Sequence, residues 1–218
     1  MRALVALAAL LPFITSAMAG ERGAEPGNFD FYVLSLSWSP SYCAAEGSDA
    51  NPRQCGAQAR PYAFIVHGLW PQYENSYPEF CPTHQPDRVP DRLVHEYLDI
   101  VPSAGLIGHQ WRKHGSCSGL TQADYLALLR KAREVVEIPS PYMRLTDATR
   151  VAPENVETQF IDANPGLPED GVTVTCDRRF LREVRICMTR DLEFRSCEEV
   201  DRNACRRSTA LMPAVRSQ

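Results

Sequence analysis

The sequence lacks several patterns that would place it in common classes of protein. It has no CxxC pair, which argues against a zinc ribbon or a thiol redox motif. It has no HExxH pattern, no internal repeat and no low-complexity tract, so one domain is expected. With 23 basic and 27 acidic side chains the net charge is −4, so it also lacks the basic surface of a protein that coats nucleic acid. Any polyanion must therefore be bound locally.

Residues 1–19 are predicted to be a signal peptide. Met1 and Arg2 form a short positive start, residues 3–16 carry no charge, and residues 17–19 (AMA) provide a small-x-small cleavage site. The apolar run is too short to span a bilayer comfortably, which disfavours a membrane anchor. We therefore expect an exported protein, either periplasmic or secreted.

All the cysteines follow this segment. The count of 8 is even, and an even count in an exported chain favours four disulfide bonds over free thiols. Eight cysteines allow about 105 pairings, and the spacing alone does not choose among them.

Hydrophobic periodicity predicts an α+β fold, with a central antiparallel sheet and helices packed around it. Residues 31–38 are predicted to be a strand with Tyr32, Leu34, Leu36 and Trp38 on one face. Residues 62–66 are apolar on both faces, which predicts a central strand, and residues 39–58 are predicted to be a loop. Helices are expected over 91–100, 121–137 and 154–163, and short strands over 172–175, 181–188 and 193–197.

The helix over 121–137 has the clearest pattern. Thr121 and Asp124 form a start similar to a capping box. Its apolar stripe is expected to lie in the core and consists of Tyr125, Leu128, Leu129, Ala132 and Val135.

Residues 109–118 (HQWRKHGSCS) concentrate polar functional groups. In a helix, residues four apart lie on one side, which pairs His109 with Lys113 and Gln110 with His114. Gly115 is predicted to stop this helix. An isolated histidine is most often a partly buried structural side chain. Four polar side chains within six residues favour a functional site instead.

A second motif, FIVHGLWPQ, places His67 where a strand runs into a turn, and strand ends hold catalytic groups rigid yet accessible. Together, FIVHGLWP and HQWRKHGSC resemble the two active-site segments of the ribonuclease T2 family. The segment YVLSLSWSPSYC is similar to the first strand and first cysteine of that family. The resemblance implies one ribonuclease T2-like domain over residues 20–218. It also implies an exported endoribonuclease that cleaves single-stranded RNA.

The resemblance also implies a role for each motif residue. In metal-independent cleavage, the ribose 2′-OH attacks the neighbouring phosphorus, so a base and an acid are needed, and imidazole suits both tasks. His67 and His114 match the two catalytic histidines, with His114 as base and His67 as acid. Lys113 matches a lysine that stabilises developing charge, and His109 matches a histidine that contacts the phosphate. The expected product is a 2′,3′-cyclic phosphate that opens to a 3′-phosphate.

Three aromatic positions and one departure from the family motif complete the predicted site. Trp70 matches a position beside the nucleotide, where it either stacks on a base or packs in the core, whereas Trp111 is expected in the core. Tyr73 and Tyr77 are candidates for a base pocket. The family usually has a glutamate where this chain has Gln110, which keeps a hydrogen-bonding oxygen but loses the charge. The predicted substrate-binding residues are therefore His109, Gln110 and Trp70.

The family pattern also implies four disulfide bonds: Cys43–Cys55, Cys81–Cys117, Cys176–Cys205 and Cys187–Cys197. His84 and His95 match no motif position and are expected to be surface or structural residues. No cofactor or metal is expected, nor any membrane association after signal cleavage, and the protein is expected to be a monomer.

Two other functions compete with this one. An RNA- or partner-binding protein that has lost catalysis would account for Gln110 and the acidic charge. A zinc hydrolase would use His67, His109 and His114, but the last two are five residues apart, which does not place both on one helical face.

Overall fold

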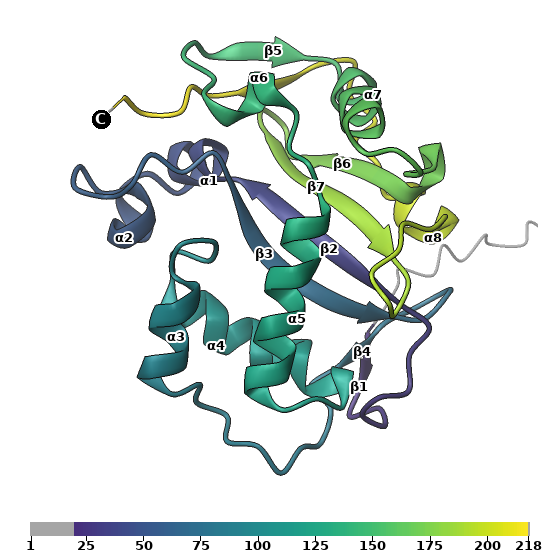
Figure 1. Ribbon diagram of the computed structural model, residues 1–218. Coiled ribbons are helices and arrows are strands. Elements are labelled where there is room, and N and C mark those ends of the chain that lie inside the picture. The colour runs from purple at the N-terminus through teal and green to yellow at the C-terminus, as the bar shows by residue number, and fades with distance from the viewer. Residues whose placement is uncertain (1–19, 218) are drawn as a thin grey trace, which may run out of the picture.

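The computed structural model describes residues 20–217 (Figure 1). The predicted signal peptide, residues 1–19, lies outside the described residues. Within residues 20–217, every helix is too short or too polar to cross a lipid bilayer.

A four-stranded antiparallel sheet forms the centre of the molecule, in the order β3-β2-β7-β6 (Figure 1). Its strands are β2 (Phe31–Trp38), β3 (Phe64–Gln72), β6 (Val172–Cys176) and β7 (Leu181–Met188). The predicted α+β class with a central antiparallel sheet is therefore confirmed.

Two of the strand predictions were wrong. The strand predicted to be central over 62–66 is β3, which lies at an edge of the sheet and continues to Gln72. It is apolar on both faces because further structure covers it, and the Val66 amide donates to the carbonyl of Ile100 at 2.9 Å. The strand predicted over 193–197 is reduced to a single bridge between Phe194 and Met188.

The predicted helices are present with shifted ends: α3 (Asp91–Tyr97), α5 (Gln122–Val135) and α7 (Pro153–Ala163). Most of the loop predicted over 39–58 is helical instead, as α1 (Ser39–Glu46) and α2 (Pro52–Cys55), and each of these helices has a proline in its first turn. The remaining elements are α4 (Ala104–Lys113), α6 (Ser140–Met143), α8 (Glu198–Asp201), β1 (Glu21–Arg22), β4 (Pro78–Glu79), β5 (Thr149–Val151), β8 (Ala210–Met212) and the 3-10 helices Gly47–Asp49, Gly115–Ser118 and Glu169–Gly171.

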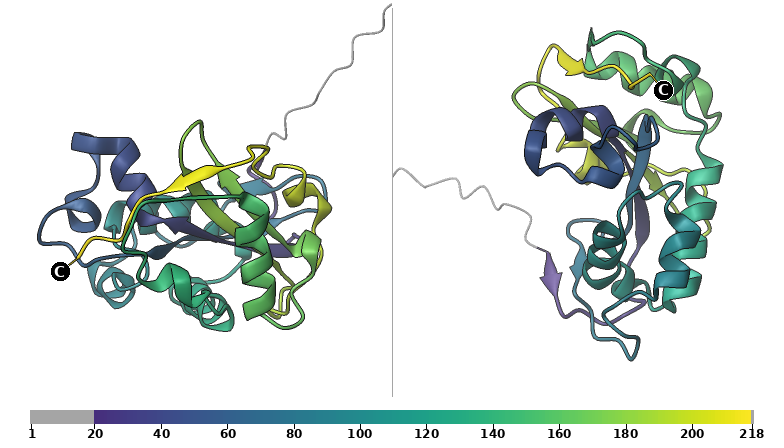
Figure 2. Two further views of the ribbon diagram at one scale, coloured as in Figure 1. Left: turned by 90° about the horizontal axis from the view of Figure 1, so that it is seen from above. Right: turned by 90° about the vertical axis from the view of Figure 1, so that its left-hand side faces the viewer.

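One face of the sheet holds the main core. The predicted face of β2 (Tyr32, Leu34, Leu36 and Trp38) is buried there, against apolar side chains of α5 and α7. Both helices lie on the same side of the sheet (Figure 2, left). One residue of the predicted α5 stripe is wrong: Val135, in the last turn, is 45% exposed, while Leu126 is buried.

The opposite face of β2 is apolar in the first half of the strand and polar in the second half. Phe31 and Val33 pack with the Cys187–Cys197 bridge and with Val200 of α8 in a small separate cluster. Ser35 and Ser37 follow on the same face and present only small side chains. This half of the face carries the polar residues described below.

Four disulfide bonds link the described chain, and all four pairings implied by the family pattern are confirmed. Cys81–Cys117 joins the segment after β4 to the end of the second motif, across 36 residues of sequence. The Phe80 amide also donates to the carbonyl of Lys113 at 2.9 Å. The two contacts fix the segment around β4 against the C-terminal end of α4.

Candidate active site

Both sequence motifs line a single cleft of about 350 Å³, which we call the histidine cleft. All six predicted site residues lie in it: His67, Trp70, His109, Gln110, Lys113 and His114. The other lining residues come from β3, β7, α8 and the segment before β4: Gln72, Tyr77, Arg185, Glu199, Val200 and Asn203.

His67 occupies a β-bulge. In the pairing of β2 with β3, Ser35 lies opposite Gly68 and Leu36 lies opposite Val66, so His67 is an extra residue on β3. A bulge redirects a side chain and bends its strand, and bulges are frequent next to active sites. The motif histidine is therefore positioned by a local irregularity of the sheet.

Helix α4 supplies the other polar residues of the cleft. Its N-cap is Ser103, whose hydroxyl accepts a hydrogen bond from the Leu106 amide at 3.2 Å. The helix ends at Lys113 with His114 as its C-cap, so Gly115 lies at the predicted C′ position, from which the chain continues as a 3-10 helix. The left-handed residue that ends this segment is Gly119, with a φ of 75°. The 3-10 turn leaves His114 at the junction, facing the cleft.

His114 is held as a neutral imidazole. It is only 6% exposed, and burial, followed by the nearby Lys113, His67 and His109 charges, lowers its pKa from 6.5 to about 3. Its Nδ1 atom is buried and has no hydrogen-bond partner among residues 20–217. Nε2 is therefore the ring nitrogen left to meet a substrate. A neutral imidazole has the protonation state that a general base requires.

The two other cationic positions of α4 lie one helical turn apart. Lys113 Nζ lies 3.5 Å from Glu79 Oε2 of β4 and 5.8 Å from the centre of the Tyr77 ring. The pKa of His109 is lowered by burial first and then by the charge of Lys113. The lowered pKa favours neutral His109, so the local positive charge of the cleft comes from Lys113 and from Arg185.

Trp70 lies between the two histidines. Its ring centre is 5.4 Å from that of His67 and 5.3 Å from that of His114, and its indole Nε1 donates to Gln110 Oε1 at 2.7 Å. The guanidinium of Arg185 lies over the same ring, 5.2 Å from its centre. Stacking of a base on Trp70 stays a prediction.

The Trp70–Gln110 hydrogen bond passes directly over Gly68. A Cβ atom at position 68 would clash with both Gln110 Oε1 and Trp70 Nε1. The glycine of the first motif thus allows the two motifs to approach and bond to each other.

Two charged residues that sequence reasoning missed complete the site. Glu183 and Arg185 lie on β7, and Glu183 Oε1 accepts a hydrogen bond from His67 Nδ1 at 2.5 Å. Its other oxygen accepts two bonds from Arg185, at 2.8 and 3.0 Å. The available signal was an acidic residue inside a strand that is otherwise rich in buried apolar residues, LREVRICM.

The Glu183 carboxylate is ionised although it is buried. Burial alone would raise its pKa, but the hydrogen bond to His67, the charge of His67 and the Arg185 guanidinium together lower it to about 2. Its side chain is 11% exposed. The site therefore contains a fixed negative charge in contact with one histidine, while the other histidine is neutral.

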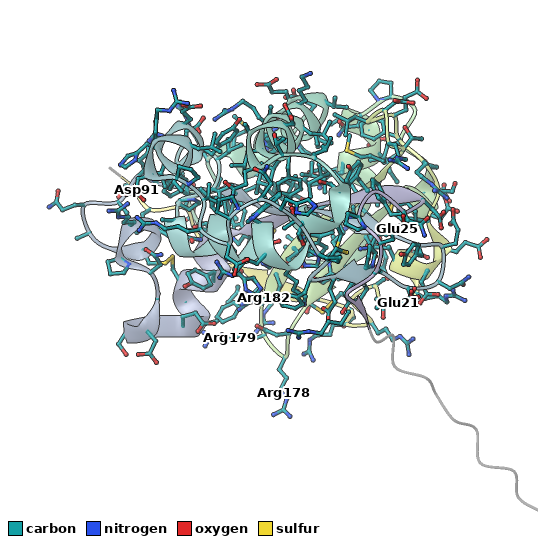
Figure 3. The ribbon with its side chains drawn as sticks, turned by 90° about the horizontal axis from the view of Figure 1, so that it is seen from below. Glu21, Glu25, Asp91, Arg178, Arg179 and Arg182 are labelled. Carbon is teal, nitrogen blue, oxygen red and sulfur yellow. A yellow bond between two sulfur atoms is a disulfide. The ribbon has the colours of Figure 1, made fainter. Side chains whose placement is uncertain are left out.

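A second hollow, of about 290 Å³, lies on the other side of His67. It shares His67 and Glu183 with the site and is also lined by Tyr42, Asn51, Ser103, Leu106 and Arg182. Arg182 lies within 4.0 Å of both Asp177 and Glu46. Figure 3 shows Arg178, from the turn between β6 and β7, pointing away from the molecule. His67 thus separates two concave surfaces.

The remaining candidate residues lie elsewhere. His84 and His95 are exposed, Trp111 is buried as predicted, and Tyr73 packs against the main core. Within residues 20–217, no group of three or more His, Cys, Asp or Glu side chains is arranged to hold a metal ion.

One buried neutral histidine and one histidine in contact with a carboxylate suit the cleavage of a phosphodiester through an internal hydroxyl, which needs one base and one acid. The fold and the site together define an endoribonuclease. The chain belongs to the ribonuclease T2 family, whose family model matches residues 29–197.

Known proteins support this assignment. The chain is 35% identical over 197 residues to a ribonuclease of Aeromonas hydrophila, an alignment that covers 84% of this chain and 81% of the relative. Among solved structures, trichomaglin, described as an S-like ribonuclease, is similar with a TM-score of 0.69 at 18% identity, over 87% of this chain and all of that one. RNase NT in complex with 5′-AMP is similar with a TM-score of 0.64 at 20% identity, over 86% of this chain and 99% of that one. At these identities the structural likeness shows the fold alone. The function as a binding protein without catalysis is not favoured.

Proposed function

We propose that this ribonuclease cleaves single-stranded RNA without a metal, by transphosphorylation. The observation that carries the proposal is the contrast between the two histidines of the cleft: His114 is buried and neutral, whereas His67 contacts an ionised carboxylate. The contrast favours His114 as the base and His67 as the acid.

The reaction proceeds in two steps. In the first, His114 takes the proton of the ribose 2′-OH, the 2′-oxygen forms a bond to phosphorus, and the bond from phosphorus to the 5′-oxygen breaks. His67 gives its proton to the departing 5′-oxygen. In the second step the two roles are exchanged: His67 takes a proton from water, and the water oxygen forms a bond to phosphorus. The bond from phosphorus to the 2′-oxygen breaks, and His114 gives its proton to that oxygen, which leaves a 3′-phosphate. Internal attack also supplies proximity, which is a large part of the rate enhancement in such reactions.

Lys113 and His109 act on the phosphate. Lys113 stabilises the negative charge that builds on the non-bridging oxygens, after exchanging its contact with Glu79 for the substrate. His109 and Gln110 bind the phosphate and hold the neighbouring groups in place. The histidine cleft and the second hollow lie on either side of His67, which suits the two nucleosides that flank a scissile phosphate.

The exported location and the monomeric state are part of the same proposal. Four disulfide bonds suit an oxidising compartment, in keeping with cleavage of a signal peptide after Ala19. N-terminal sequencing of the protein recovered from the periplasm or the medium should start at Gly20. Light scattering should give the mass of one chain.

The decisive experiment is digestion of a defined short RNA in EDTA. We expect cleavage with 2′,3′-cyclic phosphate ends that slowly become 3′-phosphates, and no cleavage at a site whose 2′-OH is replaced by hydrogen. His67→Ala and His114→Ala should each lower kcat/KM by at least about 10²-fold. His95→Ala, which removes an exposed histidine of α3, is the matched control and should keep full activity.

Each other outcome identifies a rival. Activity that is lost in EDTA and restored by zinc would establish a metal-dependent hydrolase. Tight RNA binding without cleavage would establish a binding protein. Equal losses for His95→Ala and His67→Ala would show that the site lies elsewhere.

A further inference from the structure

We propose that Glu183 is a positioning residue for His67: it holds the imidazole through Nδ1 and directs Nε2 toward the scissile phosphate. Arg185 holds Glu183 in turn. The inference rests on the proposed function, because it assumes that His67 is the acid. It adds to the two motifs a pair of charged residues on a strand that lies 116 residues further along the chain.

The hydrogen-bond geometry assigns the ring nitrogens of His67. A carboxylate with a lowered pKa can only accept, so the atom 2.5 Å away, Nδ1, carries a hydrogen and donates it. Nε2 is then the nitrogen that is free to give a proton to the leaving oxygen. A partner on the second ring nitrogen fixes both the tautomer and the orientation of a histidine. In metal sites that use this arrangement, loss of the partner typically lowers metal affinity or activity by about 10- to 100-fold.

The Glu183 carboxylate is itself held from both sides. Oε1 also lies 3.4 Å from the Ser37 hydroxyl, and Oε2 takes the two bonds from Arg185. A carboxylate with this many partners has one orientation, so it transmits that orientation to the imidazole.

Small residues on β2 allow the contact. Ser35 pairs with Gly68 on one side and with Arg185 on the other, while Ser37 pairs with Glu183, so β2 runs beneath the ion pair. A long side chain at either serine would separate His67 from β7. The Ser35 hydroxyl is fully buried and has no hydrogen-bond partner in the part of the chain that the structure describes, which indicates that this position needs a small side chain rather than a polar group.

The charged groups around His67 come from several elements. Glu183 and Arg185 belong to β7, His109 and Lys113 to α4, and His114 follows α4. Arg182 and Glu46 lie in the second hollow. Glu183 is the only one of these that hydrogen-bonds the imidazole among the described residues, so removal of its charge is the change that should move the basic limb of the pH–rate profile.

The experiment compares four forms of the protein over the pH range of the cleavage reaction. Glu183→Gln keeps the size of the side chain and an oxygen for Nδ1, but removes the charge. We expect it to lower kcat by about 10- to 100-fold with little change in KM. The basic limb of the pH–rate profile should move to lower pH, because the variant lacks the negative charge that faces the imidazole in the wild type. Glu183→Asp keeps the charge and should recover part of the rate and the position of the limb.

Glu157→Gln is the matched control. Glu157 is a partly buried carboxylate of α7 that accepts a hydrogen bond from the Val174 amide of β6, away from the cleft. Its substitution should leave the pH–rate profile unchanged. Thermal unfolding of each variant establishes that the protein measured is folded, and Glu183→Asp provides the readout if Glu183→Gln does not fold.

The outcomes separate this inference from the proposed function. If His67→Ala is severely impaired while Glu183→Gln keeps the wild-type kcat and profile, the inference is wrong and the function stands. If Glu183→Gln raises KM at an unchanged profile, Glu183 binds substrate in the second hollow, and the positioning role is wrong. If His67→Ala itself is fully active, the proposed function fails.

Discussion

The buried neutral His114 should make the stability of this protein depend on pH, in a way that one substitution can isolate. His114 has a pKa of about 3 in the folded protein, against 6.5 for an ordinary histidine. Below pH 6.5 the unfolded chain therefore binds a proton that the folded protein does not bind. The contribution of this group is fully present above pH 6.5 and is lost as the pH falls from 6.5 toward 3.

The expected size follows from linkage. Within that window, each pH unit costs about 1.4 kcal/mol of unfolding free energy for a single group. Between about pH 8 and about pH 5, His114 alone should remove roughly 2 kcal/mol. The Glu183 carboxylate acts in the same direction but in a lower window, from pH 4.5 toward 2, so it contributes little above pH 5.

The assay is urea unfolding of the disulfide-bonded protein and of His114→Asn at both pH values. Asparagine does not titrate, so the variant should lose about 2 kcal/mol less than the wild type between the two pH values. Any packing defect is present at both pH values and cancels in the comparison. His95→Asn, which removes one exposed histidine, controls for the loss of a titrating residue. Equal losses in the wild type and His114→Asn would refute the assignment of His114 as a buried neutral base.

Three further outcomes follow from the cleft. Gln110→Glu keeps the acceptor for Trp70 Nε1 and adds a charge beside His114. It should raise the maximal rate and move the acidic limb of the pH–rate profile to higher pH. Superimposable profiles of kcat/KM against pH would show that the charge has no effect. Gly68→Ala should break the Trp70–Gln110 hydrogen bond, lower the free energy of unfolding by about 1–3 kcal/mol and impair cleavage. Gly105→Ala in α4 is the control: its new methyl group meets only an ordinary contact, so it should be neutral or slightly stabilising. Equal losses in the two variants would show that the close approach at Gly68 is unimportant. Removing Cys81–Cys117 by alanine substitution should lower the free energy of unfolding by about 4 kcal/mol, because the bridge closes a 36-residue loop, and should impair catalysis. Removing Cys176–Cys205 should lower stability by a similar amount but leave the folded enzyme active. Full activity without Cys81–Cys117 would show that this bridge does not position the motifs.

Local pattern sufficed to predict the main parts of the fold and the members of the cleft. The alternation of β2 gave its buried face, because side chains two apart on a strand share a face. The spacing of His109, Gln110, Lys113 and His114 placed them together, because residues on successive helical turns are neighbours. The disulfide pairing came from the family pattern and not from spacing, since spacing alone left many pairings open.

The parts that could not be predicted depend on contacts between distant segments. The edge position of β3 is set by which strands pair, and an apolar strand of five residues looks the same at an edge as in the centre. The helices within 39–58 are short, and they are tied down by the Cys43–Cys55 bridge rather than by a periodic pattern. The bulge at His67 and its bond to Glu183 arise from the register of three strands, which the sequence of any one strand does not contain.

The two histidines of the cleft have different surroundings. Burial at the end of α4 keeps His114 without a proton, and a carboxylate on β7 faces the ring of His67. The two motifs supply the imidazoles, and strand β7 of the sheet supplies the carboxylate that contacts His67 and not His114. Gln110 of the second motif is neutral, and the ionised carboxylate that contacts a motif histidine belongs to Glu183, across β2.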